Sequence, residues 1–432
     1  MKIMRITSFI ILFLLATLTS TAQTSFRNAE PTRSTITPYN KAADAAVENI
    51  AASTFIEQVK EWEITEEGKC FTSRFTMPIA WLNRQVLVRI GRSTSAFEVE
   101  VNGQKVGYAP SGAVATEFNV TKLLHTGKND LAIRHIDAVE NGVSTLHRSS
   151  KPAIEEVMIV CQPVIRVRDI ICSTTINDLG EGVAEFAVAV KCDALNPKSS
   201  TINYTIRQND TIVLARGRRD IALDMRREDT VRFVARIPKA SLWSSASPQM
   251  LTLDLDNRIN GRASEFIRHH FGVRSADFQF GKLYVNRRAV DLRLTNYDGK
   301  QPLDTLVVGD RNGIVIDVAM ASDSLLGECD RRGIYVFVRA AINTRSFDPS
   351  IRRNGNPSNN PQWVDTYLGL NRAALYATRH HPSVVGFVIA EGESSGYNIY
   401  ESYLMMKSLE RRLPVVYEGA KGEWCSDQIV IR

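Results

Sequence analysis

The spacing of the apolar residues changes near Phe271, and this change constrains the fold more than any other feature of the chain. Before Phe271, apolar residues recur at every second position; after it, short apolar runs are separated by stretches with helical spacing. A period of two is typical of strands with one buried face, whereas strands that alternate with helices form parallel βα units. The 432 residues are therefore predicted to form roughly two to four domains, all-β first and α/β last.

The first all-β domain is predicted over residues 59–163. Residues 97–101 alternate apolar and polar side chains, and the Asn102–Gly103 pair that follows is a strong signal for a two-residue hairpin turn. Residues 71–75 and 86–90 show the same alternation. The region is predicted to be a β-sandwich.

The second all-β domain is predicted over residues 164–272. Alternation recurs at 186–190, 202–206 and 231–237. About a hundred residues of repeated strands and turns predict an immunoglobulin-like sandwich. Trp243 lies inside this strand-rich region, so we expect it in the core rather than in a ligand site.

The last region, residues 273–432, is predicted to hold parallel βα units. Short β-branched or apolar runs predict strands at residues 314–318, 334–338, 384–390 and 415–417. Helical spacing is shown by Trp363, Tyr367, Leu370 and Ala374, and again by Ile399, Tyr403 and Met406.

The N-terminal residues have the pattern of a secretory signal peptide. Lys2 and Arg5 precede the apolar run 9–16, and small residues end at Ala22, after which we expect cleavage. The apolar run is too short to span a bilayer. We therefore predict a secreted or periplasmic protein without a membrane span. Residues 23–58, which follow the leader, are predicted to form a polar segment. Cleavage would remove Lys2 and Arg5 and so lower the net charge from +6 to +4. The sequence has no basic tract, which argues against nucleic-acid binding.

Six widely spaced cysteines show no C-x-x-C motif and no cluster with histidine at the spacing of a metal site. No metal and no other cofactor is therefore predicted. Export would permit disulfides, but the spacing assigns no pairs, and buried free thiols are favoured by the burial tendency of cysteine.

Successive short motifs recur along the chain at Phe71–Pro78 with Trp81, Val101–Gly103, Phe118–Thr121, Gly127–Leu131, Leu242–Ser244, Phe271–Arg274, Asn286–Arg288, Glu328–Val336, His381–Val384 and Tyr417–Gly419. In this order they resemble the motifs of glycoside hydrolase family 2, the β-galactosidase and β-glucuronidase family. The resemblance covers nearly all of the chain after the leader and implies a sugar-binding jelly roll, an immunoglobulin-like sandwich and a catalytic TIM barrel acting on β-linked glycans. With roughly 160 residues after Phe271, against ~250 for a complete eight-stranded barrel, we expect the barrel to be incomplete.

The resemblance also implies where the acid/base group belongs. In the family, an HPSV sequence leads into a strand that ends in Asn-Glu, and the Glu is the general acid/base. Counting from His381, the Asn position falls on Glu391 and the catalytic Glu position falls on Gly392. Glu391 and Glu393 are then displaced catalytic candidates, and each should face away from the pocket because strand side chains alternate.

The other half of the catalytic pair is also expected to be missing. A retaining glycosidase needs a second carboxyl group about 5 Å from the first as nucleophile. The family carries it on a strand beyond the Tyr-Glu-Gly motif, and the sequence stops at Arg432. Polar positions of the family site are also replaced, with Arg339 at an acidic position and Arg345 at a histidine position.

Four residues remain as candidates for substrate binding: His381, Asn296, Glu418 and Trp363. Three functions stay open on this basis. The chain is expected to be a catalytically impaired glycan-binding relative of the family, an active retaining exo-β-glycosidase whose site is completed elsewhere, or a cell-envelope interaction module. A homo-oligomer or a partner that completes the barrel would fit the second.

Overall fold

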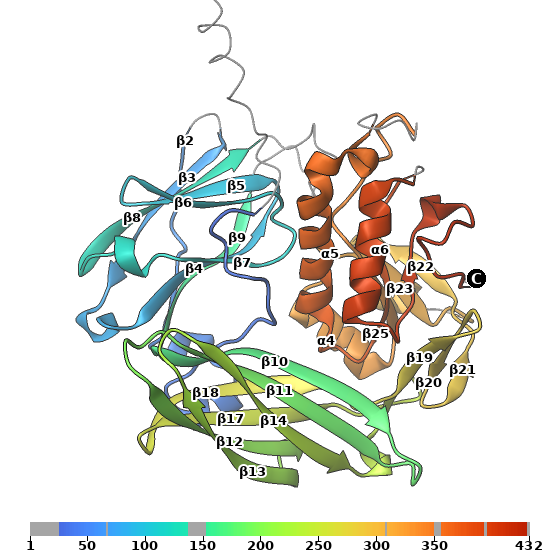
Figure 1. Cartoon of the computed structure of the whole chain (residues 1–432), viewed down its shortest axis with the longest axis horizontal. Coiled ribbons are helices and arrows are strands. Elements are labelled where there is room, and N and C mark those ends of the chain that lie inside the picture. Colours follow the sequence, from blue (N-terminus) through green and yellow to red (C-terminus); the bar gives the residue numbers. More distant parts are fainter. Residues whose placement is uncertain are drawn as a thin grey trace, which may run out of the picture.

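The computed structural model describes residues 26–65, 68–136, 153–306, 309–349, 356–392 and 395–429. Two antiparallel β-sandwiches precede a parallel β/α region, as the sequence predicts. In Figure 1 the first sandwich lies at the upper left, the second along the bottom, and the β/α region at the right. The predicted leader, residues 1–22, lies outside the described residues.

The first sandwich contains the Asn102–Gly103 turn that the sequence predicts. Asn102 and Gly103 have φ of 51° and 73°, and the turn pairs Val101 with Gln104. Phe97 and Phe118 meet edge-on between the two sheets, with ring centroids 6.2 Å apart. In spatial order, the sheets are β1 (Ile56–Gln58), β9 (Ile154–Gln162), β4 (Gln85–Ser93) and β7 (Thr116–Asn119), and β2 (Glu63–Thr65), β3 (Cys70–Met77), β8 (Gly127–Ile136), β5 (Ala96–Val101) and β6 (Gln104–Ala109).

The second sandwich is also closed by aromatic packing. Tyr204 stacks on Phe233, and Phe186 meets both Phe233 and Phe271, so side chains from both sheets share one core. Its sheets are β10 (Ile165–Ile176), β11 (Gly182–Cys192) and β14 (Glu228–Ile237), and β13 (Ile212–Leu223), β12 (Lys198–Gln208), β17 (Leu251–Ile259) and β18 (Arg262–Phe271).

The segment predicted to be merely polar, 23–58, is in fact packed against both sandwiches over its described part. Isolated bridges join Arg27 to Tyr108 of the first sandwich and Tyr39 to Phe266 of the second. Tyr39 is buried, and the short helix α2 (Ala42–Ala46) and a 3-10 turn (Ile50–Ala52) follow it. The segment therefore straps the two sandwiches together.

Trp243 lies in the core, as expected, where it joins the second sandwich to the β/α region. It is fully buried, and its indole Nε1 donates to the Asp330 carbonyl at 2.8 Å. The connecting elements are the pair β15 (Trp243–Ser244) and β16 (Ser247–Pro248) and the antiparallel sheet β19 (Ala276–Gln279), β20 (Lys282–Val285) and β21 (Arg288–Val290).

The β/α region is a five-stranded sheet in sequence order, parallel throughout, with helices α5 and α6 side by side on one face (Figure 1). The predicted runs form its strands because both faces of a parallel sheet are covered and select apolar residues. The elements are β22 (Leu294–Tyr297), α3 (Leu303–Leu306), β23 (Gly313–Asp317), α4 (Asp323–Arg332), β24 (Tyr335–Arg339), α5 (Val364–Thr378), β25 (Val384–Val388), α6 (Tyr397–Leu409) and β26 (Val415–Val416). Further 3-10 turns are Ile79–Trp81, Thr121–Leu123, Lys239–Ser241, Pro357–Asn359, Pro361–Trp363 and Glu418–Ala420.

All six cysteines lie in described segments and are free thiols, five of them buried. Among the described residues, no helix has the length and apolar character needed to cross a bilayer.

A buried ion pair fastens the second sandwich to the β/α region. Asp169 of β10 is 1% exposed; it accepts a hydrogen bond from Arg379 at 2.7 Å and one from the Ser34 backbone at 3.1 Å. Burial alone would raise the pKa of Asp169, but the charge and hydrogen bond of Arg379, the Ser34 amide and the Arg33 charge together outweigh burial and hold the pKa below its usual value. The carboxylate is therefore held in its charged form between three parts of the chain.

We predict that Asp169→Asn lowers the free energy of unfolding by about 3 kcal/mol, because it leaves the Arg379 charge buried without its partner. Urea unfolding measures this, with Asp220→Asn as control, since the Asp220–Arg218 pair is exposed and its loss should change stability much less. The folded pKa lies below the unfolded one, so the contribution is complete above the unfolded pKa and is lost as the pH falls through the folded pKa. Equal losses in the two variants would contradict the prediction.

Candidate active site

The polar side chains of the β/α region gather where its parallel strands end. In parallel α/β sheets and barrels, functional groups lie at the carboxyl ends of the strands, because the loops that follow converge there. Asn296 lies on β22, Asp317 ends β23 and Arg339 ends β24. Glu391 follows β25, and Glu418 follows β26.

Arg339, at the end of β24, contacts polar side chains of the neighbouring strands β23 and β22. Its guanidinium donates to Asp317 Oδ1 and to Asn296 Oδ1, both at 2.9 Å. The Arg339 side chain is 11% exposed, so the ion pair with Asp317 is largely shielded from water. The carboxylate of Asp317 is thus neutralised by its neighbour on β24.

Glu391 is held by donors on both of its oxygens. Asn343 Nδ2 donates to Oε2, and Arg345 approaches Oε1, each at 2.7 Å. The same Arg345 lies 3.8 Å from Glu418. The backbone is fixed as well, because Glu391 N donates to the Ile342 carbonyl and the Glu391 carbonyl accepts from the Thr344 amide. Each Glu391 oxygen is thus already in contact with a neighbouring donor side chain.

Gly392 lies where the chain leaves no room for a side chain. A Cβ on Gly392 would be 2.1 Å from Thr344 Oγ1 and 3.1 Å from the Tyr417 hydroxyl. Thr344 is buried, so its hydroxyl cannot swing into solvent. A side chain at position 392 would therefore require Thr344 to move.

Comparison with known proteins identifies the architecture. Residues 321–431 match the TIM barrel domain of glycosyl hydrolases family 2. This part of the chain is therefore similar to the family 2 barrel domain. The match takes in β24, β25, β26 and the helices between them, which carry the Arg345, Glu391 and Glu418 group.

Known relatives share this architecture at low sequence identity. The β-galactosidase of Psychromonas ingrahamii is 23% identical over 392 residues, which are 83% of this chain and 36% of that protein. A Bacteroides uniformis β-glucuronidase 2 structure matches 82% of this chain and 46% of its own, with a TM-score of 0.66 and 17% identity. The structure of a β-galactosidase homologue from Bacteroides fragilis matches 86% of this chain and 58% of its own, with a TM-score of 0.68 and 14% identity. The chain thus spans between about a third and three fifths of the length of these relatives.

The structure brings some of the sequence-derived candidates together and separates others. Asn296, Glu391 and Glu418 lie at one edge of the sheet, bound through Arg339 and Arg345. Glu393, the second displaced catalytic candidate, lies outside the described residues.

His381 and Trp363 lie away from the other candidates. His381 is at the opposite end of β25, with Nδ1 2.5 Å from Asp330 Oδ2. Burial disfavours its charged form, but Asp330 and Asp323 outweigh burial and raise the pKa of His381 to about 9. Trp363 is 7% exposed and packs in the core beneath α5. Neither side chain contributes to the polar group around Glu391.

Sequence reasoning missed Asp317, Asn343 and Thr344 as members of this group. A signal was present for two of them, because Asp317 ends a predicted strand and Asn343 closely follows another. The contact of Thr344 with Gly392 had no signal, since the two residues meet only after β24 and β25 pair.

We predict that Gly392→Ala destabilises the chain by about 1–3 kcal/mol, the usual cost of overpacking. In a Thr344→Ala background the cost should fall by more than half, because the hydroxyl that meets the new Cβ is gone. Denaturant unfolding of the two single variants and the double variant measures this coupling. Gly327→Ala is the control: it lies inside α4, meets only the flexible end of Arg331, and should be neutral or stabilising. Additive effects of Gly392→Ala and Thr344→Ala would contradict the prediction.

Proposed function

We propose that this chain is a secreted or periplasmic family 2 relative that binds β-linked glycans and hydrolyses them poorly or not at all. The observation that carries the proposal is the lack of space for a side chain at Gly392, the position that corresponds to the family acid/base. Without a proton donor at this position, the leaving oxygen departs unassisted.

The carboxylates at the carboxyl ends of the parallel strands also support weak or absent hydrolysis. A retaining mechanism requires one carboxyl group that donates a proton and one carboxylate that is free to attack. Asp317 is paired with Arg339, and Glu391 is bound by both Arg345 and Asn343. These carboxylates are engaged in internal contacts rather than directed at a vacant sugar position.

Glycan binding is proposed for a groove of about 630 Å³ on the first sandwich. Trp62 lines it and is half-buried, whereas Trp81, Tyr108 and Trp363 are buried. An aromatic face beside directed polar groups is the usual arrangement of a site for a small molecule such as a sugar. The polar groups on the same groove come from Ser73, Arg74, Asn102 and Asp130.

The proposed location outside the cytoplasm depends on the leader pattern of residues 1–22. Fractionation of cells that express the full sequence, with N-terminal sequencing of the recovered protein, tests this proposal directly. Cleavage after Ala22 is the expected result.

An active retaining exo-β-glycosidase is the second candidate function. It is favoured by the approach of Glu391 and Glu418 to the same Arg345, which places two carboxylates at the catalytic edge of the sheet. In this mechanism Glu391 would donate the proton to the leaving oxygen, and a carboxylate from outside the described residues, or from another chain, would attack the anomeric carbon.

Hydrolysis assays distinguish the two functions. We predict that the purified chain turns over aryl β-galactosides, β-glucuronides and β-mannosides far more slowly than ~1 s⁻¹, the lower end of ordinary enzyme rates. Heat-denatured protein provides the background rate. Turnover above ~1 s⁻¹ that is lost in the Glu391→Gln variant would favour the active enzyme instead.

Glycan binding is tested separately on the groove of the first sandwich. We predict that Trp62→Ala weakens the binding of β-linked oligosaccharides at least tenfold, because the aromatic face is removed. Phe280→Ala is the matched control, since Phe280 is 96% exposed in the turn between β19 and β20 and lies outside the groove. A glycan array on the parent chain followed by calorimetry on the variants gives the measurement. Equal affinities of the parent and the Trp62 variant would exclude this groove as the binding site.

A further inference from the structure

Three potential metal ligands converge at the end of the sheet opposite the candidate active site. Asp323 is the first residue of α4, and His380 and His381 lie between α5 and β25. The ligand atoms of these three residues all lie within 4.8 Å of one another. Asp323 Oδ1 is 3.9 Å from His380 Nε2 and 3.6 Å from His381 Nε2.

The buried carboxylate of Asp330 orients His381 for coordination. Asp330 is 1% exposed, and its Oδ2 lies 2.5 Å from His381 Nδ1 while Oδ1 accepts from the Ser383 amide at 3.0 Å. A carboxylate on one nitrogen of an imidazole fixes the ring and leaves the other nitrogen for the metal, as in the carboxylate–histidine–zinc arrangement. In His381 that other nitrogen is Nε2, the one that faces Asp323.

His381 Nε2 is buried and has no hydrogen-bond partner among the described residues. The whole residue is 6% exposed, so a bulk water molecule does not readily replace that partner. A buried nitrogen without a hydrogen bond lowers the stability of the fold, and a cation bound to that nitrogen would restore the missing interaction.

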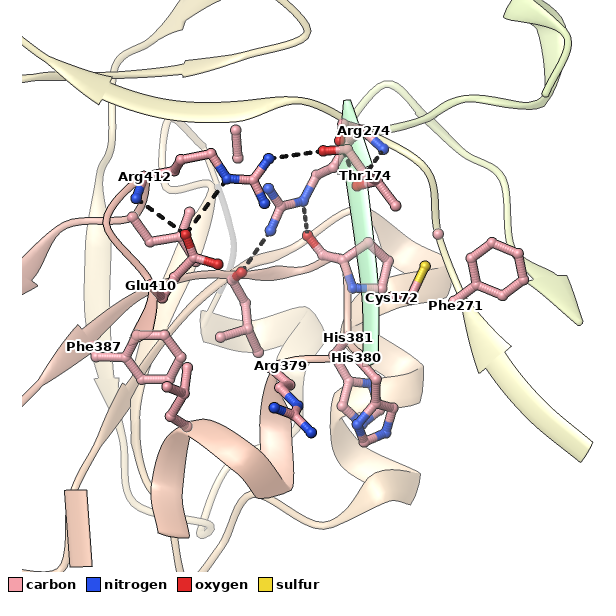
Figure 2. A pocket seen from close by; sticks show the side chains of 16 residues that line it. Cys172, Thr174, Phe271, Arg274, Arg379, His380, His381, Phe387, Glu410 and Arg412 are labelled. Atoms are coloured by element: carbon pink, nitrogen blue, oxygen red, sulfur yellow. Dashed lines mark hydrogen bonds and ion pairs between the residues drawn. The ribbon is translucent and has the colours of Figure 1, made fainter. Parts of the chain in front are cut away.

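The backbone that carries the histidines is fixed independently of any ligand. Arg274, which is buried, donates from Nε to the Pro382 carbonyl at 2.6 Å and from a terminal nitrogen to the Val384 carbonyl at 2.7 Å. Figure 2 shows this guanidinium above the turn, with the His380 and His381 rings side by side below it. The two rings are therefore presented in a preformed arrangement.

We propose that Asp323, His380 and His381 form a binding site for a divalent transition metal of the zinc type. Bonds of 2.0–2.2 Å in tetrahedral geometry place ligand atoms about 3.3 Å apart. The two separations from Asp323 Oδ1, 3.9 and 3.6 Å, therefore need to contract by less than about 1 Å, and the two histidines already have their ligand atoms within 4.8 Å of each other. Two imidazoles and one carboxylate favour zinc, cobalt or nickel over magnesium or calcium, which prefer oxygen ligands. The Asp323 side chain is 64% exposed, so the group borders solvent on the Asp323 side, whereas both histidines are largely buried.

The site lies at the junction between the β/α region and the second sandwich. The His380 ring is 5.4 Å from the ring of His269, which belongs to β18. A metal here joins the start of α4 to the start of β25 beside that contact, so its role is to stabilise the junction rather than to take part in glycan chemistry.

The test uses the full chain without an affinity tag, stripped with a chelator and titrated with Zn²⁺ by calorimetry. One equivalent is expected to bind, and His380→Ala and Asp323→Asn should each weaken binding at least tenfold. His270→Ala is the matched control, because His270 faces the single carboxylate Glu48 at 2.9 Å and is not a member of the three-ligand group. Circular dichroism confirms that each variant is folded.

The visible absorption of bound Co²⁺ provides a second readout, which reports the coordination geometry rather than the affinity. Bound at two imidazoles and one carboxylate with low coordination number, Co²⁺ should give the strong visible absorption of a four- or five-coordinate ion, and His380→Ala should abolish it. The proposal is overturned if the chain binds no Zn²⁺, or if Zn²⁺ affinity and the Co²⁺ spectrum are unchanged in both ligand variants.

Discussion

The buried carboxylate of Asp330 is the contact on which the arrangement of the β/α region depends. Its two oxygens hold the His381 ring and the Ser383 amide, and its own carbonyl accepts from the Trp243 indole. A single residue of α4 thereby fixes the start of β25 and connects it to the second sandwich. Because β25 pairs in parallel with β24 and β26, fixing its start helps to set where Glu391 and Gly392 lie beyond its far end.

The two ends of β25 differ in whether their polar side chains have partners within the protein. At the carboxyl end the acidic groups are matched by arginines, with Arg339 bound to Asp317 and Arg345 bound to Glu391. At the amino end the nitrogen of His381 that faces Asp323 lacks a hydrogen-bond partner among the described residues. The acidic groups at the carboxyl end of β25 are thus matched by internal partners, whereas the amino end keeps a buried nitrogen without one, and a new ligand is expected at the amino end.

Much of the fold could be predicted from the sequence, because burial imposes its period directly on the residues. Alternation predicted β5, β11, β12 and β14, and positive φ at Asn102–Gly103 was predicted from the residue types alone. The strap at 26–58 was missed because its binding to Asp169 and Phe266 uses backbone groups that leave no pattern in side chains. The vacancy at Gly392 was visible in the sequence, whereas its cause, Thr344, appears only when two strands distant in the chain are paired.

The N-terminal strap has a consequence for the order of assembly. Residues 27–39 are synthesised before every strand that they bind, because their partners Tyr108, Phe118 and Phe266 lie later in the chain. The strap therefore stays unpaired until those strands have been synthesised. A polar composition suits that interval, because a segment that stays exposed during synthesis is safer from aggregation when it carries few apolar side chains.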